Sequence, residues 1–421
     1  MSESRSLRAE LLGRGILLTY LVCLVSTTTE GVQNLLFPLY LDHYGYALTA
    51  IGTLSSVLGV MRLASRVPVG ARYRGSRARA QQLLWLALFL ISTSGYAFAH
   101  GELALVVLVT VVHGFTFGAL GTINLAVAID ISGGRKAGAV MGWYTAALSA
   151  GYAIGAFGAG ALADRIGIDA TLFWLGLTPV VAMVAVWLTP TVADTERAAS
   201  VAGVPWWRRG LSAFMAIDGR VWLAFAIVLF INVLSDSTDT FFPLYGTALG
   251  LPVAFIGVLK ASKSASATVI RFFAGALFRF LDFRAINFWA VIVFAVTMFV
   301  IPVIGGAGAG PVLLAVFLVA GLCRGILRVT SAATVAEIRA EGRDIGLASG
   351  VYNAGLDLGA VIGPAAGGVL AAAFGIPAML QLLPVVSLGL YFAVALSSKA
   401  GRSALTITPR AKASAPVGGG R

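Results

Sequence analysis

Long apolar runs alternate with short polar breaks along most of the chain. A helix needs about 20 mostly apolar residues to cross a bilayer, and the pattern meets this length twelve times. The expected spans are residues 15–41, 49–72, 79–99, 102–130, 137–163, 168–191, 219–247, 252–279, 284–304, 310–335, 345–373 and 377–398. The pattern therefore predicts an all-α integral membrane protein.

The composition excludes a water-soluble globular protein. Of the 421 residues, 58% are hydrophobic and only 11% are charged, whereas soluble domains carry about 25% charged residues. Fifty glycines are scattered through the apolar runs, as is typical of membrane helices that pack closely. Both cysteines, Cys23 and Cys323, fall inside predicted spans, so no disulfide framework is expected.

The positive charges predict the orientation. An even number of spans places both termini on one side of the membrane. Outside the spans, Lys and Arg fall in the tails and the even-numbered loops, with Arg165 as the exception. Positive residues favour the cytoplasmic side, so we expect both termini to be cytoplasmic and the protein to lie in the plasma membrane. The net charge of +12 then reflects membrane topology, and no nucleic-acid partner is expected.

The longest polar break divides the chain into two sets of six spans. We expect an N-terminal bundle over residues 1–191, a cytoplasmic linker over 192–218, a C-terminal bundle over 219–398 and a disordered tail over 399–421. The linker contains "VPWWRRG", in which tryptophans beside arginines suit a short helix at the membrane interface.

The two halves repeat each other in sequence. "FPLY" at Phe37–Tyr40 recurs at Phe242–Tyr245, an offset of 205 residues, and "GRKAGAVMGWYTAALSAGYAIG" resembles "GRDIGLASGVYNAGLDLGAVIG" at an offset of 208. Matched pairs include Arg66 with Arg271, Gly70 with Gly275, Arg74 with Arg279, Tyr144 with Tyr352, Gly151 with Gly359 and Gly155 with Gly363. Such a repeat predicts two parallel halves related by an axis along the membrane normal.

Over residues 12–398 the chain resembles the major facilitator superfamily of secondary transporters. The resemblance implies two six-helix bundles, alternating access and a monomer. The family's gate pattern, Gly-x-x-x-Asp-Arg, is altered after spans 2 and 8, where Gly70 and Gly275 are followed by Arg74 and Arg279 in the acidic position; the full pattern appears as "GALADRIG" after span 5. The family's antiporter pattern is partial at Gly151 and Gly155 and whole at Gly359, Gly363 and Pro364. These glycines serve either static packing or a sliding surface between the halves.

Ionisable residues occur at mid-depth in the predicted spans. Such a group costs at least ~2.5–3.5 kcal/mol and normally faces a partner or a water-filled cavity. The set comprises Arg62, Lys260, Lys263, Arg324, Glu30, Asp236, Asp239, Asp357 and His113. The charges either pair internally or leave a positive cavity when the acids are protonated. Nearer the cytoplasmic ends, Arg66, Arg271 and Arg328 are expected to snorkel or to make gate contacts.

These residues lead to specific role assignments. We expect substrate binding by Arg324, Lys260, Lys263, Arg62, Asn34, Tyr144 and Tyr352, and proton coupling by Glu30, Asp236, Asp239, Asp357 or His113. In particular, Arg324 with Lys260 or Lys263 is expected to bind a carboxylate or phosphate, since guanidinium groups bind such anions bidentately.

The sequence therefore predicts a proton-coupled transporter of a small organic anion or zwitterion, with antiport efflux favoured over symport uptake. Hydrophobic-cation efflux stays open as an alternative, as does a membrane-embedded enzyme or a sensor. No P-loop, metal-ligand cluster or nucleophile motif appears in the sequence, so neither enzymatic activity nor a cofactor is expected. The expected partners are the solute, protons and the lipid bilayer.

Overall fold

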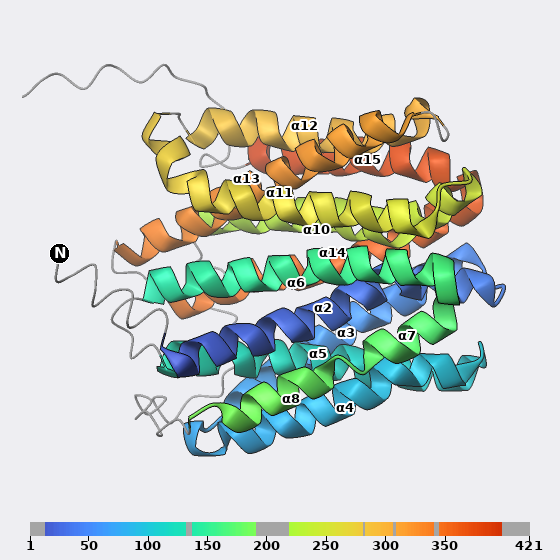
Figure 1. Ribbon diagram of the computed structural model, residues 1–421. Coiled ribbons are helices and arrows are strands. Elements are labelled where there is room, and N and C mark those ends of the chain that lie inside the picture. Colours follow the sequence, from blue (N-terminus) through green and yellow to red (C-terminus); the bar gives the residue numbers. More distant parts are fainter. Residues whose placement is uncertain are drawn as a thin grey trace, which may run out of the picture.

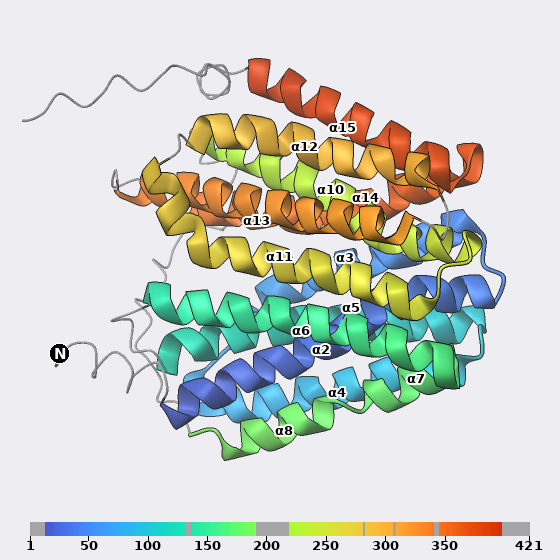
Figure 2. The same cartoon turned by 45° about the horizontal axis from the view of Figure 1, so that its top comes forward.

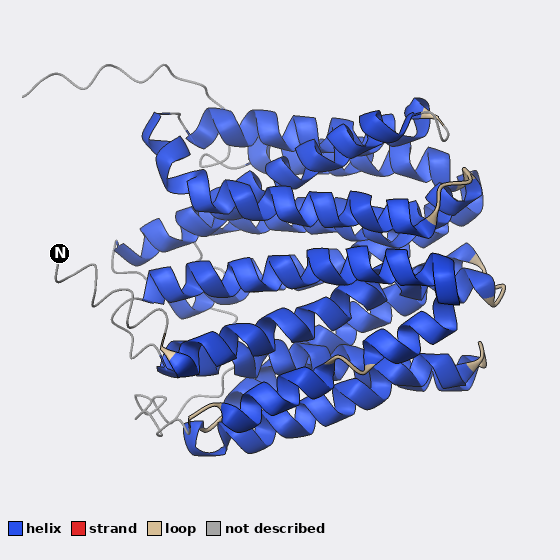
Figure 3. Cartoon of the chain, in the orientation of Figure 1, coloured by secondary structure: helices blue, strands red, loops and turns tan. Residues whose placement is uncertain are grey.

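The computed structural model describes residues 13–131, 137–190, 219–280, 283–305, 309–340 and 345–397. Within these ranges the regular structure is entirely helical (Figure 3). The helices are α2 (Arg14–His43), α3 (Leu48–Arg72), the short 3₁₀ helix η1 (Gly75–Arg77), α4 (Ala78–Ala99), α5 (Leu103–Ile131), α6 (Ala137–Ile166), α7 (Ile168–Gly176), α8 (Pro179–Leu188), α10 (Gly219–Ala248), α11 (Val253–Phe280), α12 (Phe283–Ile304), α13 (Gly310–Ala340), α14 (Ile345–Phe374) and α15 (Ile376–Ser397). The expected linker helix within 192–218 and the tail at 399–421 lie outside the described residues.

Twelve of the described segments are long and apolar enough to cross a membrane, as predicted. The sixth segment differs from a single span because it is divided into α7 and α8. Pro179 begins α8 and has no N–H to continue the hydrogen bonding of α7. Here the Thr178 hydroxyl bonds the Leu175 carbonyl at 2.7 Å and the Thr29 hydroxyl of α2 at 2.7 Å, so side chains satisfy part of the broken backbone.

The helices run side by side and form two halves (Figures 1 and 2). Helices α2–α8 make up one half and α10–α15 the other. Within the halves, α2 packs on α6 and α10 packs on α14, which are equivalent pairs in the sequence repeat. Between the halves, α3 packs on α14 and α11 packs on α6, again an equivalent pair. Both described chain ends lie at the left of Figure 1, which we call the terminal end; the opposite edge is the loop end.

The peripheral helices expose large apolar side chains to their surroundings. Examples are Ile91 on α4, Trp187 on α8, Val303 on α12 and Leu390 on α15, each more than half exposed. Because isolated apolar groups of this size gain nothing from contact with water, helices α4, α7–α8, α12 and α15 are placed to face lipid. The polar and charged residues are consequently concentrated in the eight inner helices.

Candidate functional site

A central cavity of about 350 Å³ lies between the two halves. Its walls come from α2, α3, α5, α6, α10, α11, α13 and α14. The charged residues that line it are Arg62, Arg66, Lys260, Lys263, Arg271, Arg324, Arg328, Asp236, Asp239 and Asp357. By the same measure a single buried water needs roughly 10–15 Å³, so the cavity has room for a small organic solute.

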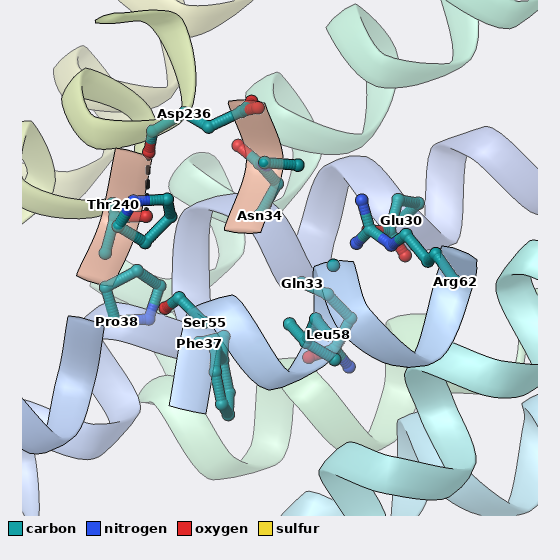
Figure 4. A pocket seen from close by; sticks show the side chains of 13 residues that line it. Glu30, Gln33, Asn34, Phe37, Pro38, Ser55, Leu58, Arg62, Asp236 and Thr240 are labelled. Atoms are coloured by element: carbon teal, nitrogen blue, oxygen red, sulfur yellow. Dashed lines mark hydrogen bonds and ion pairs between the residues drawn. The ribbon is translucent and has the colours of Figure 1, made fainter. Parts of the chain in front are cut away.

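A smaller cavity of about 50 Å³ adjoins the central one. Asn34, Arg62 and Asp236 line both cavities. Figure 4 shows Glu30 beside Arg62 on one side of the smaller cavity, with Asp236 and Thr240 on the other. The central acids and bases are therefore divided among several distinct clusters.

The first cluster joins Glu30, Arg62 and His113 inside the N-terminal half. One Glu30 oxygen accepts a hydrogen bond from the Arg62 guanidinium, and the other lies 2.9 Å from His113 Nε2. The Glu30 and His113 side chains are buried, and the guanidinium carbon lies 4.9 Å from the centre of the Phe117 ring. A buried carboxylate is stable only when paired and hydrogen-bonded, and here both of its oxygens are satisfied.

The second cluster lies in the C-terminal half. Lys263 Nζ donates to Asp239 Oδ1 at 2.6 Å and to the Ser235 hydroxyl at 3.1 Å. All three groups are buried, and the Asp239 carboxylate neutralises the charge of Lys263. Lys263 also lines the central cavity, so its expected contact with the solute stays a prediction.

The third cluster connects the two halves. Arg66 of α3 donates to Asp357 Oδ1 of α14 at 2.8 Å. Arg271 of α11 donates to the Ser149 hydroxyl of α6 at 2.7 Å. Arg66 and Arg271 thus both make contacts between the halves, and both line the central cavity.

Lys260 binds two main-chain carbonyls that prolines leave without a helical donor. Pro38 and Pro243 are repeat-equivalent and lie inside α2 and α10. A proline has no N–H for the carbonyl four residues earlier, which frees the carbonyls of Asn34 and Asp239. Lys260 Nζ donates to these same two oxygens, at 2.6 and 2.8 Å. The buried ammonium therefore links the halves. Lys260 also lines the central cavity, so its expected role on the solute stays a prediction.

Arg324 and Asp236 differ from the other central charges. Neither side chain makes a hydrogen bond or ion pair with any described residue, although both line the central cavity. Arg328, one turn from Arg324 on α13, donates to the Asn232 amide oxygen at 2.8 Å, which is an uncharged acceptor. Arg324, Lys260 and Lys263 all line the central cavity, so the predicted combination of Arg324 with a lysine stays a prediction.

The tyrosines divide between the cavity and the helix packing. Tyr144 and Asn34 line the central cavity, whereas Tyr352 is absent from its walls. The Tyr352 hydroxyl lies 3.4 Å from the Ser331 hydroxyl and from the Arg328 carbonyl, and its side chain packs against the buried cluster of Val221 and Ala224. Tyr152 also lines the cavity and was not predicted; its spacing of eight residues from Tyr144 places both on one face of α6.

The glycines of the antiporter pattern pack within each half. Cβ atoms on Gly151 and Gly155 would collide with α2, and those on Gly359 and Gly363 would collide with α10. This arrangement favours the packing interpretation, because the neighbours belong to the same half and do not slide past it. The close approaches between the halves involve other glycines.

Those approaches close the loop end. Gly52 of α3 abuts the Pro364 carbonyl of α14, and a Cβ on Gly160 of α6 would lie 2.6 Å from the Val253 carbonyl of α11. Asp164 accepts the main-chain N–H groups of Val253 and Ala254, at 3.1 and 2.8 Å, and so caps the first turn of α11. The Gly160 and Asp164 of "GALADRIG" thus act where the two halves meet.

The terminal end lacks this arrangement in its described part. Gly70 lies near Thr122, and Arg74, which precedes η1, has no carboxylate with which to cap a helix. Gly275 and Arg279 fall in the last turns of α11, where side chains lie outside the described part of the structure. The central cavity extends toward this end, and the Arg66 side chain on its wall is 45% exposed.

Comparison with known proteins gives one family and a set of related folds. Residues 19–341 match the family described as Major Facilitator Superfamily. A mutant of the nucleoside transporter NupG superimposes with a TM-score of 0.70 at 14% identity, over 93% of this chain and 100% of that one. A second NupG structure gives 0.68 at 12% identity, over 90% and 98%. At these identities the likeness shows the fold alone. No curated protein matches the chain.

Proposed function

Because this chain belongs to the Major Facilitator Superfamily of membrane transporters, we propose that it carries a small organic anion by alternating access, coupled to protons. The observation that carries the proposal is Arg324. Its guanidinium lines the central cavity without a hydrogen bond or ion pair to any described residue. A charge at this depth is expensive unless water or a partner compensates it, and an anionic solute supplies that partner.

The charge of the whole cavity supports an anion. Seven basic and three acidic side chains line it, an excess of four positive charges when all are ionised. Glu30, which binds Arg62 from the adjoining cavity, reduces the excess to three. The positive field of the cavity would repel a cation, which argues against the hydrophobic-cation alternative. A neutral solute would gain no attraction from the field.

Asp236 is our candidate for the proton site. Among the four central acids, it alone lacks an ion pair within the described residues; Glu30, Asp239 and Asp357 each contact a base. It also lines both cavities, between the solute site and the Glu30 cluster. An acid in that position is free to bind and release a proton during the transport cycle, because no ion pair with a described residue fixes its charge.

The proposed orientation places the termini in the cytoplasm, so the described state is open inward. The closed loop end and the cavity that extends toward the terminal end support this assignment of state. The glycine–proline pattern of α14 favours antiport efflux over symport uptake, with a proton entering as the solute leaves.

The proposal is tested with purified protein in proteoliposomes. Organic acids, zwitterionic amino acids and hydrophobic cations are screened for a thermal shift and for counterflow exchange. We expect an anion to bind and Arg324→Ala to weaken its binding by roughly 2–4 kcal/mol, as for a lost buried charge pair. Arg72→Ala is the matched control, because it removes an exposed arginine whose side chain bonds, among the described residues, only the Pro68 carbonyl. Unchanged anion affinity in folded Arg324→Ala would refute the anion site.

A further inference from the structure

The contacts that Arg66 and Arg271 make between the halves occupy equivalent positions in the sequence repeat. Arg66 and Arg271 are equivalent at the offset of 205, and Ser149 and Asp357 are equivalent at the offset of 208. In each case an arginine of one half donates to the helix of the other half, at 2.8 Å to Asp357 and 2.7 Å to Ser149. The repeat therefore preserves the geometry of the contact.

It does not preserve the charge. The carboxylate of Asp357 neutralises Arg66, whereas the hydroxyl of Ser149 holds Arg271 in place and leaves its charge uncompensated. Near Arg271 are two further guanidinium groups, those of Arg324 and Arg328, which lie within Coulombic range of it and of each other. Among described residues, Arg328 bonds a neutral amide and Arg324 bonds nothing.

The acids around these three arginines are too few to neutralise them. Asp236 is within Coulombic range of Arg324 and Arg328 and offsets one charge at most. Asp239 is bound by Lys263, and Asp357 by Arg66. Two positive charges therefore remain among these three arginines of α11 and α13.

We infer that the transported solute carries two negative charges, as a dicarboxylate or a phosphate monoester does, and that Ser149 determines this preference by leaving Arg271 charged. The inference rests on the proposed function, since it names the charge of the same solute. Guanidinium forks suit both anions, because each presents pairs of oxygens at the spacing of two N–H donors. Ser149 acts as a positioning residue through Arg271.

The test compares anions of matched shape and different charge. Succinate is paired with succinamate, in which an amide replaces one carboxylate. Methyl phosphate is paired with methyl sulfate at about pH 8, where the phosphate is a dianion because its second pKa is near 6. Binding is measured by calorimetry on folded, monodisperse protein. We expect the dianion of one pair to bind roughly tenfold or more tightly than its partner, the effect of one charged hydrogen bond.

Substitutions at the contact then identify its source. Ser149→Asp recreates the ion pair of the other half and should reduce the dianion preference to near unity. Ser149→Asn introduces a side chain of the same size as aspartate but without its charge, and it should retain the dianion preference. Thr145→Asp adds the same charge one turn earlier on α6, away from the cavity walls, and controls for a general field. If Ser149→Asp does not fold, Arg271→Gln removes the same charge and should give the same loss.

The outcomes separate the two proposals. The pair that shows the preference decides between a dicarboxylate and a phosphate monoester. Equal affinities within both pairs, or an unchanged preference in Ser149→Asp, would overturn the inference while leaving anion transport intact. Binding of none of the four anions would also overturn it. If Arg324→Ala leaves every anion's affinity unchanged as well, the proposed function itself fails.

Discussion

The link through Lys260 makes a quantitative prediction. Its ammonium bonds the Asn34 and Asp239 carbonyls, which Pro38 and Pro243 deprive of their helical donors. Lys260→Met keeps an unbranched side chain that is one atom shorter and removes both bonds. Each buried carbonyl left unpaired costs about 1–3 kcal/mol, and loss of the buried charge offsets part of this. We expect the free energy of unfolding to fall by about 2 kcal/mol.

A double-mutant cycle isolates the cause. Pro38→Ala restores an N–H that can bond the Asn34 carbonyl within α2, so Lys260→Met should then cost less by about 1–3 kcal/mol, the value of one satisfied carbonyl. Pro243→Ala should couple in the same way through the Asp239 carbonyl. Pro302→Ala, in α12, is the control and should be additive.

The assay is reversible unfolding in mixed micelles, followed by far-UV circular dichroism, with each single and double variant measured at one detergent composition. Coupling between Lys260 and both prolines is the expected result. Coupling below about 0.5 kcal/mol for both, which is the ordinary limit of additivity, would show that the prolines and the lysine act independently and would refute the reasoning.

Three further outcomes are expected. Asp236→Asn should abolish accumulation driven by a proton gradient and spare solute exchange in proteoliposomes; normal accumulation would move the proton site elsewhere. Asp164→Ala should remove the cap on α11 at a cost of about 0.5–2 kcal/mol and increase labelling of cysteines placed at the loop end, and unchanged labelling would count against this role. On a cysteine-free background, Glu102→Cys should react with impermeant reagent from outside the cell and Arg77→Cys only after permeabilisation; the reverse pattern would invert the proposed topology.

The distribution of motifs gives a reason for the state that the structure adopts. A carboxylate can cap a helix N-terminus across the interface between the halves, and an arginine cannot. Asp164 makes such a cap at the loop end. At the terminal end the corresponding position after α3 is Arg74. The closed loop end is therefore better supported by contacts than a closed terminal end would be.

Much of the fold was determined by the sequence alone. Apolar length decides whether a helix can span a bilayer, because unpaired backbone groups cannot be left in hydrocarbon, and this rule predicted all twelve spans. The repeat of "FPLY" and of the glycine-rich segments predicted two equivalent halves. The break at Pro179 was missed, since an apolar run looks the same whether its helix is continuous or divided.

The partners of the charged residues were decided by the tertiary structure. The sequence identified which ionisable residues lie at mid-depth, since depth follows from position along a span. Pairing depends on rotation and contact of helices far apart in the chain, and hydrophobic periodicity does not encode these for helices that are apolar on most faces. Lys260 and Lys263 line the cavity as expected of solute-binding residues, but the sequence did not reveal that each also bonds groups of the protein. Arg271 was expected to snorkel or to make a gate contact, and it bonds Ser149 of the other half on the cavity wall. Only the packing of α11 against α6 and α13 brings Arg271 toward Arg324 and Arg328, where their charges act together.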